Sequence, residues 1–396
     1  MQLKNYLFAF VPYKQIRKLK KYGTLKFLLW GKAKRQFGHY LLQEADPVLN
    51  LHKMETSLGN EVVTGFTACH NAYIACKDLL REYVLVCQNC IIEPKYGWGI
   101  DVATDTLIFD SIANNSWLET YHPGYFQYKK SKEKADFYPD IISIRMLKGG
   151  ERNYWHFLHD LLGEVVLAKE YVPNAENIPY LISEDLAKQP FFKQAIAESD
   201  YLSGLNWVVQ KKDQYVRAGN AYFLQVRPNK KETLLAVRSL FNLPLADNAH
   251  KRKIFLTRNP KRIRYLKNVG EIELIAVKYG FEIIDADKLS FSEQINLFRQ
   301  VRFLAGIHGA GLVNMIFRQG APMSLLELFP QNYIQPHYFW LSKDLGFDYA
   351  CLVGSKAGSD TAFAIAPAEF EDKIQEMLRA EHVNTSTPVD IMNSKS

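Results

Sequence analysis

The last third of the chain alternates short apolar segments with longer amphipathic ones, and this alternation limits its fold more than any other feature. We expect strands at residues 253–257, 281–285, 301–307, 324–329 and 349–353. Helices are expected between them, at residues 271–279 and 291–300 and from near Gly309 onward. Regular alternation of this kind predicts parallel strands joined by crossover helices. The last third is therefore predicted to be a doubly wound α/β domain.

The rest of the chain supplies enough further pattern for a second domain. Short strands separated by turn residues are expected at 83–86, 106–109 and 141–146, followed by helices at 153–170 and 184–198 and strands at 180–183 and 207–210. A length of 396 residues exceeds one ordinary domain, and Pro228 and Pro244 interrupt the pattern near 230–250. The predicted organisation is a basic helical extension at 1–60, an α/β domain at 61–235, a second α/β domain at 236–383 and a disordered tail at 384–396.

Positive charge is concentrated at the N-terminal end. Residues 1–43 contain ten Lys or Arg and no Asp or Glu, which leaves 39 basic against 42 acidic residues in the remainder. Such a segment suits nucleic acid or an anionic membrane. A nucleic-acid binder also needs a basic stripe on its folded body, and this body is slightly acidic. We therefore predict that residues 1–43 bind an anionic membrane surface and that nucleic acid is not a partner.

Within this segment, residues 14–37 read as one or two basic amphipathic helices broken near Gly23. A solvated helical hairpin packed on the body is the open alternative. No apolar run of eighteen residues is present, so no transmembrane helix is expected, and residues 6–11 do not read as a signal peptide. Cys87 and Cys90 have CxxC spacing but no second pair to complete a zinc site. We interpret the cysteines as reduced thiols, which favours a cytoplasmic protein. Together with the basic segment, this predicts a protein that is peripheral at the inner face of a membrane.

The strongest local signal for a binding site is the turn from Gly306 to Asn314. It follows an apolar strand and opens a helix, and ligands of such sheets bind beyond the carboxyl ends of the strands. Gly309 and Gly311 leave backbone amides bare at a helix start that carries partial positive charge. His308 is placed to donate to a phosphate or a sugar hydroxyl. Glycine is also needed in tight turns for steric reasons alone, so the turn by itself is weak evidence.

Two further residues stand at strand ends of the same domain. Arg258 follows the first strand, and its guanidinium suits a diphosphate, with a surface arginine as the alternative. Glu327 lies inside an apolar strand, where a carboxylate is costly to bury without a partner. We expect Glu327 to accept hydrogen bonds from a ribose, with pairing to a core arginine as the alternative.

A polar pair also interrupts the helix expected at 153–170. His156 and Asp160 are four residues apart and share one face, which is otherwise apolar. The alternative is that both residues cap or brace the helix. Asp285 and Asp287 have the spacing of a metal-binding DxD pair, but we interpret them as a loop or helix cap. A dehydrogenase is not favoured, because the first strand of the last domain is not followed by a glycine-rich turn.

These motifs, in this order, resemble those of glycosyltransferase family 61, which includes bacterial capsular polysaccharide biosynthesis enzymes. The family's helix motif is matched at Asn153, Tyr154, His156, Leu158 and Asp160. Its arginine motif is matched at Thr257, Arg258, Arg264, Asn268 and Glu271, and its helix start at Leu289, Ser290, Phe291, Glu293 and Gln294. Two further family motifs, H-G-A-G-L-x-N and L-E-L-F-P, correspond to residues 308–314 and 326–330. The resemblance covers roughly residues 150–355.

The resemblance implies a GT-B fold, with two Rossmann-like domains facing a cleft, and inversion at the anomeric carbon. It implies a hexosyl- or pentosyltransferase that moves sugar from a nucleotide-sugar donor to a surface polysaccharide or lipid-linked acceptor. A non-catalytic carbohydrate- or nucleotide-binding relative is the alternative. The sequence departs from the family at Gly163 and Glu164, where the family shows Pro-Arg, and at Val269, which replaces an acid.

The resemblance also implies roles for individual residues. The expected donor contacts are Arg258, Arg264, His308, Gly309, Ala310, Gly311, Asn314 and Glu327. An inverting transfer needs a base for the acceptor hydroxyl, and we expect Asp160 to supply it, with His156 as helper or as the base itself. No metal and no cofactor are expected, because Arg258, His308 and the helix start at Gly309 can stabilise a leaving diphosphate electrostatically.

Overall fold

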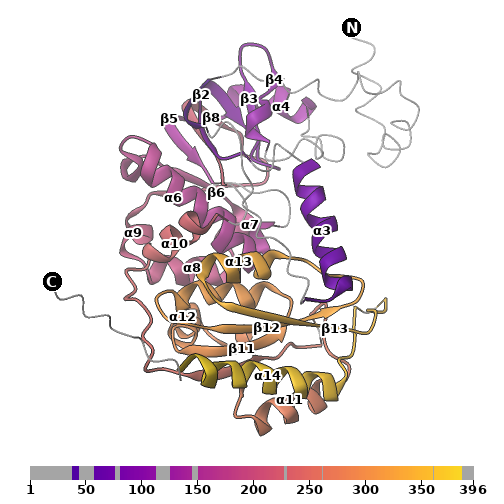
Figure 1. Ribbon diagram of the computed structural model, residues 1–396. Helices are drawn as coiled ribbons and strands as arrows, with labels where there is room; N and C mark the ends of the chain where they lie inside the picture. Colours follow the sequence, from indigo (N-terminus) through magenta and orange to yellow (C-terminus); the bar gives the residue numbers. More distant parts are fainter. Residues whose placement is uncertain are drawn as a thin grey trace, which may run out of the picture. The chain divides into compact units, whose positions relative to one another are not determined.

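The computed structural model describes residues 38–43, 58–75, 81–112, 125–144, 150–226, 230–260, 262–359 and 361–385 (Figure 1). They divide into two compact units. The first unit comprises the described residues of 1–49 and 73–241, and the second unit those of 50–72 and 242–396. The basic helices expected at 14–37 lie outside the described residues, whereas residues 39–43 of the same predicted helical extension form a strand.

The first unit is built on an eight-stranded mixed sheet. Its strands are β1 (His39–Gln43), β2 (Tyr83–Ile92), β3 (Gly99–Asp101), β4 (Thr106–Leu107), β5 (Asp136–Ser143), β6 (Tyr180–Ser183), β7 (Trp207–Gln210) and β8 (Val216–Gln225). The order is β4-β3-β2-β8-β5-β6-β7, with β1 paired to β2. Strands β8, β5, β6 and β7 are parallel, and β2 joins them antiparallel to β8. Four strands of this sheet are thus parallel, and antiparallel strands extend it.

Some helices of the first unit begin at a residue whose side chain caps them. The main helices of this unit are α4 (Tyr125–Ser131), α5 (Tyr154–His156), α6 (Leu162–Tyr171), α7 (Glu184–Ala187), α8 (Pro190–Ala197), α9 (Asp200–Gly204) and α10 (Lys231–Ser239), and the π-helical turn η7 (Phe157–Leu161) joins α5 to α6. Ser183 caps α7 and Ser199 caps α9. The single helix expected at 184–198 is two helices, because Pro190 lacks an N–H and occupies the first turn of α8.

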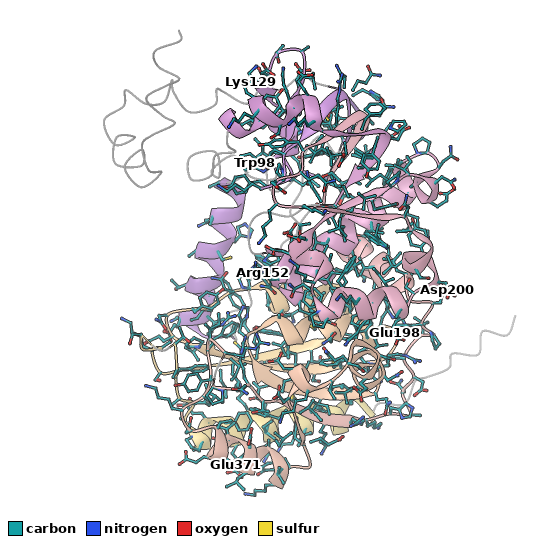
Figure 2. All side chains as sticks on the ribbon, turned by 180° about the vertical axis from the view of Figure 1, so that it is seen from behind. Trp98, Lys129, Arg152, Glu198, Asp200 and Glu371 are labelled. Carbon is teal, nitrogen blue, oxygen red and sulfur yellow. The ribbon has the colours of Figure 1, made fainter. Side chains whose placement is uncertain are left out.

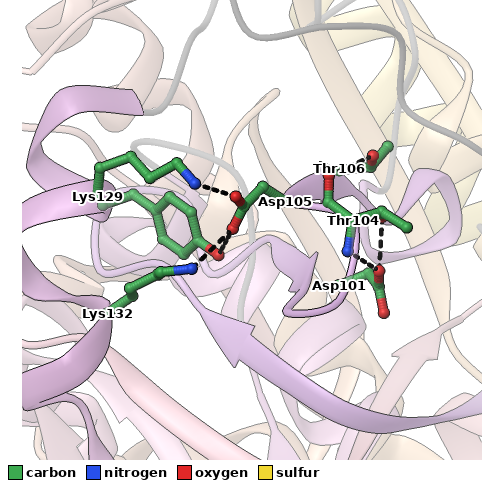
Figure 3. A network of polar contacts seen from close by, with 7 residues as sticks. Asp101, Thr104, Asp105, Thr106, Lys129 and Lys132 are labelled. Carbon is green, nitrogen blue, oxygen red and sulfur yellow. Dashed lines mark hydrogen bonds and ion pairs between the residues drawn. The ribbon is translucent and has the colours of Figure 1, made fainter.

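A polar network ties the β3–β4 turn to α4 in this unit (Figure 3). Asp105 accepts a hydrogen bond from the Tyr128 hydroxyl at 2.5 Å and ion pairs with Lys129 and Lys132. In the same turn, Asp101 accepts from the backbone and hydroxyl of Thr104. Trp98, labelled in Figure 2, is buried in the same hydrophobic cluster as Tyr128.

The second unit has a five-stranded, wholly parallel sheet. Its strands are β9 (Arg252–Leu256), β10 (Glu282–Ile284), β11 (Val301–Ile307), β12 (Ser324–Pro330) and β13 (Asp348–Gly354), in the order β10-β9-β11-β12-β13. Each of the five strands expected from the sequence is present, and its ends differ from the prediction by at most one residue. The order reverses between β9 and β11, which creates a switch point at their carboxyl ends.

Helices cover both faces of this second sheet. They are α11 (Val269–Lys278), α12 (Phe291–Phe298), α13 (His337–Leu345) and α14 (Pro367–Thr385), with 3₁₀ turns η9 (Ala286–Lys288) and η10 (Ala310–Arg318). Figure 1 shows α11 and α14 on one face and α12 and α13 on the other. On the outer side, Glu371 of α14 bonds Lys278 and Tyr279 at the end of α11 (Figure 2). The predicted two-sheet α/β fold is confirmed; the cleft between the domains stays a prediction.

Helix α3 (Asn60–Ala75) begins in the second unit, since residues 50–72 group with it. Phe66 packs on Phe329 and Phe339, although its place in the sequence led us to expect it in the domain at 61–235. At the other end of the chain, α14 includes residues 384 and 385 of the tail expected to be disordered, and the rest of that tail lies outside the described residues. None of the helices in the described ranges has the length and apolar character needed to span a bilayer.

Candidate functional site

The switch point of the second unit holds an arginine against a glycine turn. Arg258 follows β9 and His308 follows β11, and these two strands are adjacent and parallel. The Nη1 of Arg258 donates to the carbonyl of His308 at 3.1 Å. A Cβ atom on Gly309 would lie 2.2 Å from that Nη1, so only glycine lets the guanidinium approach the turn. The backbone of Gly309 is extended, with a φ of 177°, which shows that close approach and not backbone shape requires the glycine.

A second arginine, Arg264, is held in a strained backbone conformation beside the first. Arg264 has a φ of 61° and Thr361 a φ of 63°, both in the left-handed region that side chains disfavour. The N–H of Arg264 donates to the Thr361 hydroxyl at 2.9 Å. Its Nε and Nη1 are buried without a hydrogen-bond partner among the described residues. Unsatisfied buried donors are rare in proteins, and these two are suited to the oxygens of a ligand.

The electrostatics of the two arginines favour an anion. Burial, and then the charge of Arg264, lower the pKa of Arg258 from its ordinary 12.5 to about 10. Arg258 stays charged at neutral pH despite this shift. A bound anion would offset both the loss of hydration and the repulsion between the two guanidinium groups.

His308 is part of a buried chain of hydrogen bonds. Its Nδ1 lies 2.5 Å from Oε1 of Glu327, whose Oε2 accepts from the Tyr349 hydroxyl at 2.6 Å. Burial, together with the charges of Arg264 and Arg258, lowers the pKa of His308 well below its ordinary 6.5. Burial likewise raises the pKa of Glu327 well above its ordinary 4.5. Both shifts favour the uncharged pair, in which the carboxyl proton is donated to Nδ1 and Nε2 keeps its own hydrogen as a donor.

This arrangement differs from the ribose contact expected for Glu327. Its side chain has no exposed surface, and both carboxyl oxygens are already bonded to protein groups. In the structure, Glu327 therefore orients His308. The hydrogen bonds described for Glu327 go to His308 and Tyr349, so the alternative of pairing to a core arginine is not observed either.

Aromatic rings surround the His308 imidazole. Phe329 stacks on it at 5.2 Å between ring centroids, and Tyr338 and Tyr333 lie at 5.4 and 5.6 Å. Tyr338 is buried and donates to the Gly309 carbonyl at 2.6 Å. Tyr333 is 44% exposed, and the Arg264 guanidinium lies 4.6 Å from its ring centroid. Tyr333 thus offers one face to Arg264 in a cation–π contact and keeps substantial surface open.

The other residues predicted to contact the donor lie at the start of η10 and differ in their surroundings. Gly309 is the N-cap of η10 and has no side chain that could cap it, and Ala310 and Gly311 form the first turn. Asn314 differs, because it is fully buried and donates to Gln294 at 2.7 Å and to the Gly311 carbonyl at 3.2 Å. Asn314 therefore braces η10 against α12. A direct contact of Asn314 with a donor is not what the described geometry supports.

The aspartate pair after β10 takes the structural role expected of it. Asp285 caps η9 by accepting from the backbone of Asp287 at 3.1 Å. Asp287 in turn forms an ion pair with Arg262 at 2.8 Å.

The polar helix face of the first unit contains a carboxylate held between two histidines. Nδ1 of His156 lies 2.6 Å from Oδ2 of Asp160, and Nδ1 of His159 lies 2.5 Å from Oδ1. Burial alone would raise the pKa of Asp160, but the charge of His159 and the hydrogen bonds of both histidines outweigh it. They hold that pKa well below the ordinary carboxylate range. Asp160 is therefore ionised at any working pH.

The two histidines differ in exposure. The His159 side chain is 4% exposed and stacks on Trp155 at 5.0 Å, whereas the His156 side chain is 34% exposed. Because Nδ1 of His156 faces Asp160, its Nε2 is the nitrogen left for another group. A histidine oriented in this way by a carboxylate can accept a proton at Nε2. The three side chains lie on or beside the π-helical turn 157–161, a distortion that is frequent at functional sites.

Comparison with known proteins agrees with the motif pattern. Residues 154–324 match the family model described as Glycosyltransferase 61. This stretch of the chain is a glycosyltransferase family 61 domain. No curated protein matches the sequence. A solved structure, that of E. coli heptosyltransferase WaaC with ADP, is similar at 11% identity over 60% of this chain and 99% of that chain, with a TM-score of 0.29.

The family 61 domain contains His156, Asp160, Arg258, Arg264 and His308. The sequence did not predict several side chains that contact these residues or Glu327. These are His159, Tyr333, Tyr338, Tyr349 and Thr361. His159 precedes Asp160 directly, and neighbours in a regular helix lie about 100° apart, so helical periodicity did not predict their contact within the π-helical turn. The other four follow the domain in the sequence, and their contacts depend on tertiary structure alone.

Proposed function

We propose that this chain is an inverting glycosyltransferase that moves a sugar from a nucleotide-sugar donor to a hydroxyl acceptor without a metal ion. The family 61 domain supports sugar transfer. The main observation in support of the donor site is the pair Arg258 and Arg264. Their two guanidinium groups lie close enough to repel each other, and Arg264 has buried, unsatisfied donors. A diphosphate supplies both the negative charge and the acceptor oxygens that this pair lacks.

In the proposed reaction the donor's diphosphate is the leaving group. As the bond between the anomeric carbon and the diphosphate oxygen breaks, negative charge grows on that oxygen. Arg258, Arg264, the Nε2 hydrogen of His308 and the amides at the start of η10 can stabilise this charge. Because these groups are already held by the protein before the reaction, little reorganisation is needed as the charge develops.

For the proton of the acceptor hydroxyl we propose His156 as the base, where the sequence favoured Asp160. A carboxylate whose pKa is held well below the ordinary range is a poor base near neutrality. Asp160 instead holds Nδ1 of His156 and stabilises the imidazolium that forms, as the carboxylate does in related triads. The acceptor oxygen attacks the anomeric carbon, its proton passes to Nε2 of His156, and the diphosphate leaves with the bonding electron pair.

We propose that the predicted domain at 61–235 binds a polysaccharide or lipid-linked acceptor and the domain at 236–383 the donor, in the GT-B manner. The basic segment 1–43 would hold the protein at an anionic membrane surface on the cytoplasmic side, since clustered basic residues contribute about 1 kcal/mol each to such binding.

A thermal-shift panel of nucleotides and nucleotide sugars tests the donor site. A ligand present at about a hundred times its dissociation constant stabilises the protein by about 2.7 kcal/mol, which is readily measured. Arg258→Ala should abolish most of the shift and lower transfer by about 2–4 kcal/mol in transition-state stabilisation. Full activity in that variant would exclude the proposed role of Arg258. A protein that binds a nucleotide sugar but neither transfers nor hydrolyses it would be a non-catalytic relative.

A further inference from the structure

Helix α3 packs on the connection from β12 to α13, residues 331–336, and on the two elements that this connection joins. A Cβ atom on Gly65 would lie 2.9 Å from Cβ of Ile334, so this helix face lies directly on the segment. The thiol of Cys69 donates to Oε1 of Gln335 at 3.2 Å. Phe66 is fully buried and places its ring 6.2 Å from Phe329 and 5.4 Å from Phe339, one residue at each side of the connection.

The segment that α3 contacts also carries an aromatic side chain of the donor site. Tyr333 directly precedes Ile334, and its ring packs on Arg264 at 4.6 Å and lies 5.6 Å from His308. Tyr333 is 44% exposed, so its own side chain is packed on one side only. Its position therefore depends on the backbone of residues 331–336, and the two residues after it are those that α3 contacts.

We infer that α3 is a positioning element of the donor site, which fixes Tyr333 against Arg264 through Gly65, Phe66 and Cys69. The inference rests on the proposed function of that site. Both α3 and the 331–336 segment lie outside residues 154–324, so neither belongs to the matched family domain. A cation–π contact requires the cation over the ring face, and ordering a loop on binding costs free energy. A loop that α3 already orders presents Arg264 to a diphosphate without that loss.

Gly65→Ala is the most direct perturbation, since the added methyl must displace Ile334. Gly270→Ala is its matched control, because Gly270 lies on α11 of the same unit and a Cβ there meets nothing within 4 Å. Both changes replace a helical glycine by alanine, so they share the gain in helix propensity. Gln335→Ala removes only the acceptor of the Cys69 thiol and provides a milder second test.

The test measures the affinity of UDP, GDP, ADP and CMP for each full-length variant by thermal shift and titration calorimetry. For whichever nucleotide binds best, Gly65→Ala should raise Kd at least about threefold and Gln335→Ala less, with Gly270→Ala unchanged. Tyr333→Ala should raise Kd similarly, and adding Gly65→Ala to it should have no further effect, because α3 acts through Tyr333. Independent, additive effects of the two changes would overturn the inference, and so would unchanged affinity in Gly65→Ala and Gln335→Ala.

The outcomes separate the inference from the function on which it rests. If none of the four nucleotides binds the wild-type protein, the donor site itself is refuted and the inference with it. If a nucleotide binds and the α3 variants bind it equally well, only the inference fails. Should Gly65→Ala fail to fold, Gln335→Ala alone and combined with Tyr333→Ala decides the same question.

Discussion

Replacing Glu327 by glutamine should remove a pH-dependent loss of stability that the buried carboxyl causes. The carboxyl has no exposed surface, and burial raises its pKa well above the ordinary 4.5. A glutamine has nearly the same shape, and its amide can donate to Nδ1 of His308 and accept from Tyr349 as the protonated carboxyl does. Glu327→Gln therefore keeps the contacts and removes the titration.

The magnitude follows from proton linkage. A carboxyl with a raised pKa stays protonated in the folded protein after it has ionised in the unfolded chain. Its contribution to stability is complete below the unfolded pKa and is lost as the pH rises toward the folded pKa, at about 1.4 kcal/mol per pH unit. As the pH rises from 5 toward the raised pKa of Glu327, the wild type should therefore lose stability relative to Glu327→Gln, with that slope as the upper limit. His308 has a lowered pKa and loses stability on acidification in both proteins, so it cancels in this difference.

Urea unfolding followed by tryptophan fluorescence measures the difference, since Trp340 is buried on α13 of the same unit. The free energies of unfolding of wild type and variant should diverge as the pH rises from 5 to 7. Glu369→Gln is the control, because Glu369 is exposed and its replacement should leave the two curves parallel. Parallel curves for Glu327→Gln would show that Glu327 is ionised in the folded protein, and the uncharged His308–Glu327 pair would be refuted.

The remaining predictions concern transfer and membrane binding. His156→Ala and Asp160→Asn should each lower turnover at least about a hundredfold with donor affinity intact, and normal turnover in His156→Ala would exclude it as the base. Gly309→Ala should weaken nucleotide binding at least about tenfold, because its Cβ would lie 2.2 Å from Arg258 Nη1; unchanged affinity in calorimetry would contradict this. Deleting residues 1–43 should abolish sedimentation with anionic but not neutral vesicles, and equal binding to both lipids would count against the membrane role. Transfer should survive EDTA, whereas a loss that Mn²⁺ restores would revive a metal-dependent reaction.

Periodicity predicted β11 and β12 of the second unit most directly, because both are largely apolar and are buried along their whole length. The same reasoning missed β8, a central strand of the first sheet. Its middle reads Arg217 to Asn220, with residues typical of turns. A Cβ atom on Gly219 would lie 2.5 Å from the Pro139 carbonyl, so the glycine lets β8 approach β5 closely. Such a requirement comes from the neighbouring strand and leaves no periodic signal.

The candidate site was predictable to the extent that it depends on strand ends. Arg258 and His308 follow adjacent parallel strands, so topology alone brings them together. The partners that set their charge were not predictable in this way. Glu327 binds His308 through the register of β11 and β12, and Tyr349 reaches it from β13. These pairings depend on which strands are neighbours and on which side chains face the same way.

The His308–Glu327 and His156–Asp160 pairs have similar distances, but their surroundings give the two carboxyls opposite charge states. In the His308–Glu327 pair, side-chain exposures of 7% and 0% favour the uncharged form. In the His156–Asp160 pair, exposures are 34% and 22%, and a second histidine on the carboxylate keeps Asp160 ionised. An uncharged His308 donates to a leaving diphosphate without adding a third cation beside Arg258 and Arg264. An ionised Asp160 stabilises the proton that His156 takes from an acceptor. Each pair thus has the charge that its proposed step requires, and the surroundings of the carboxyl, not its being Asp or Glu, set that charge.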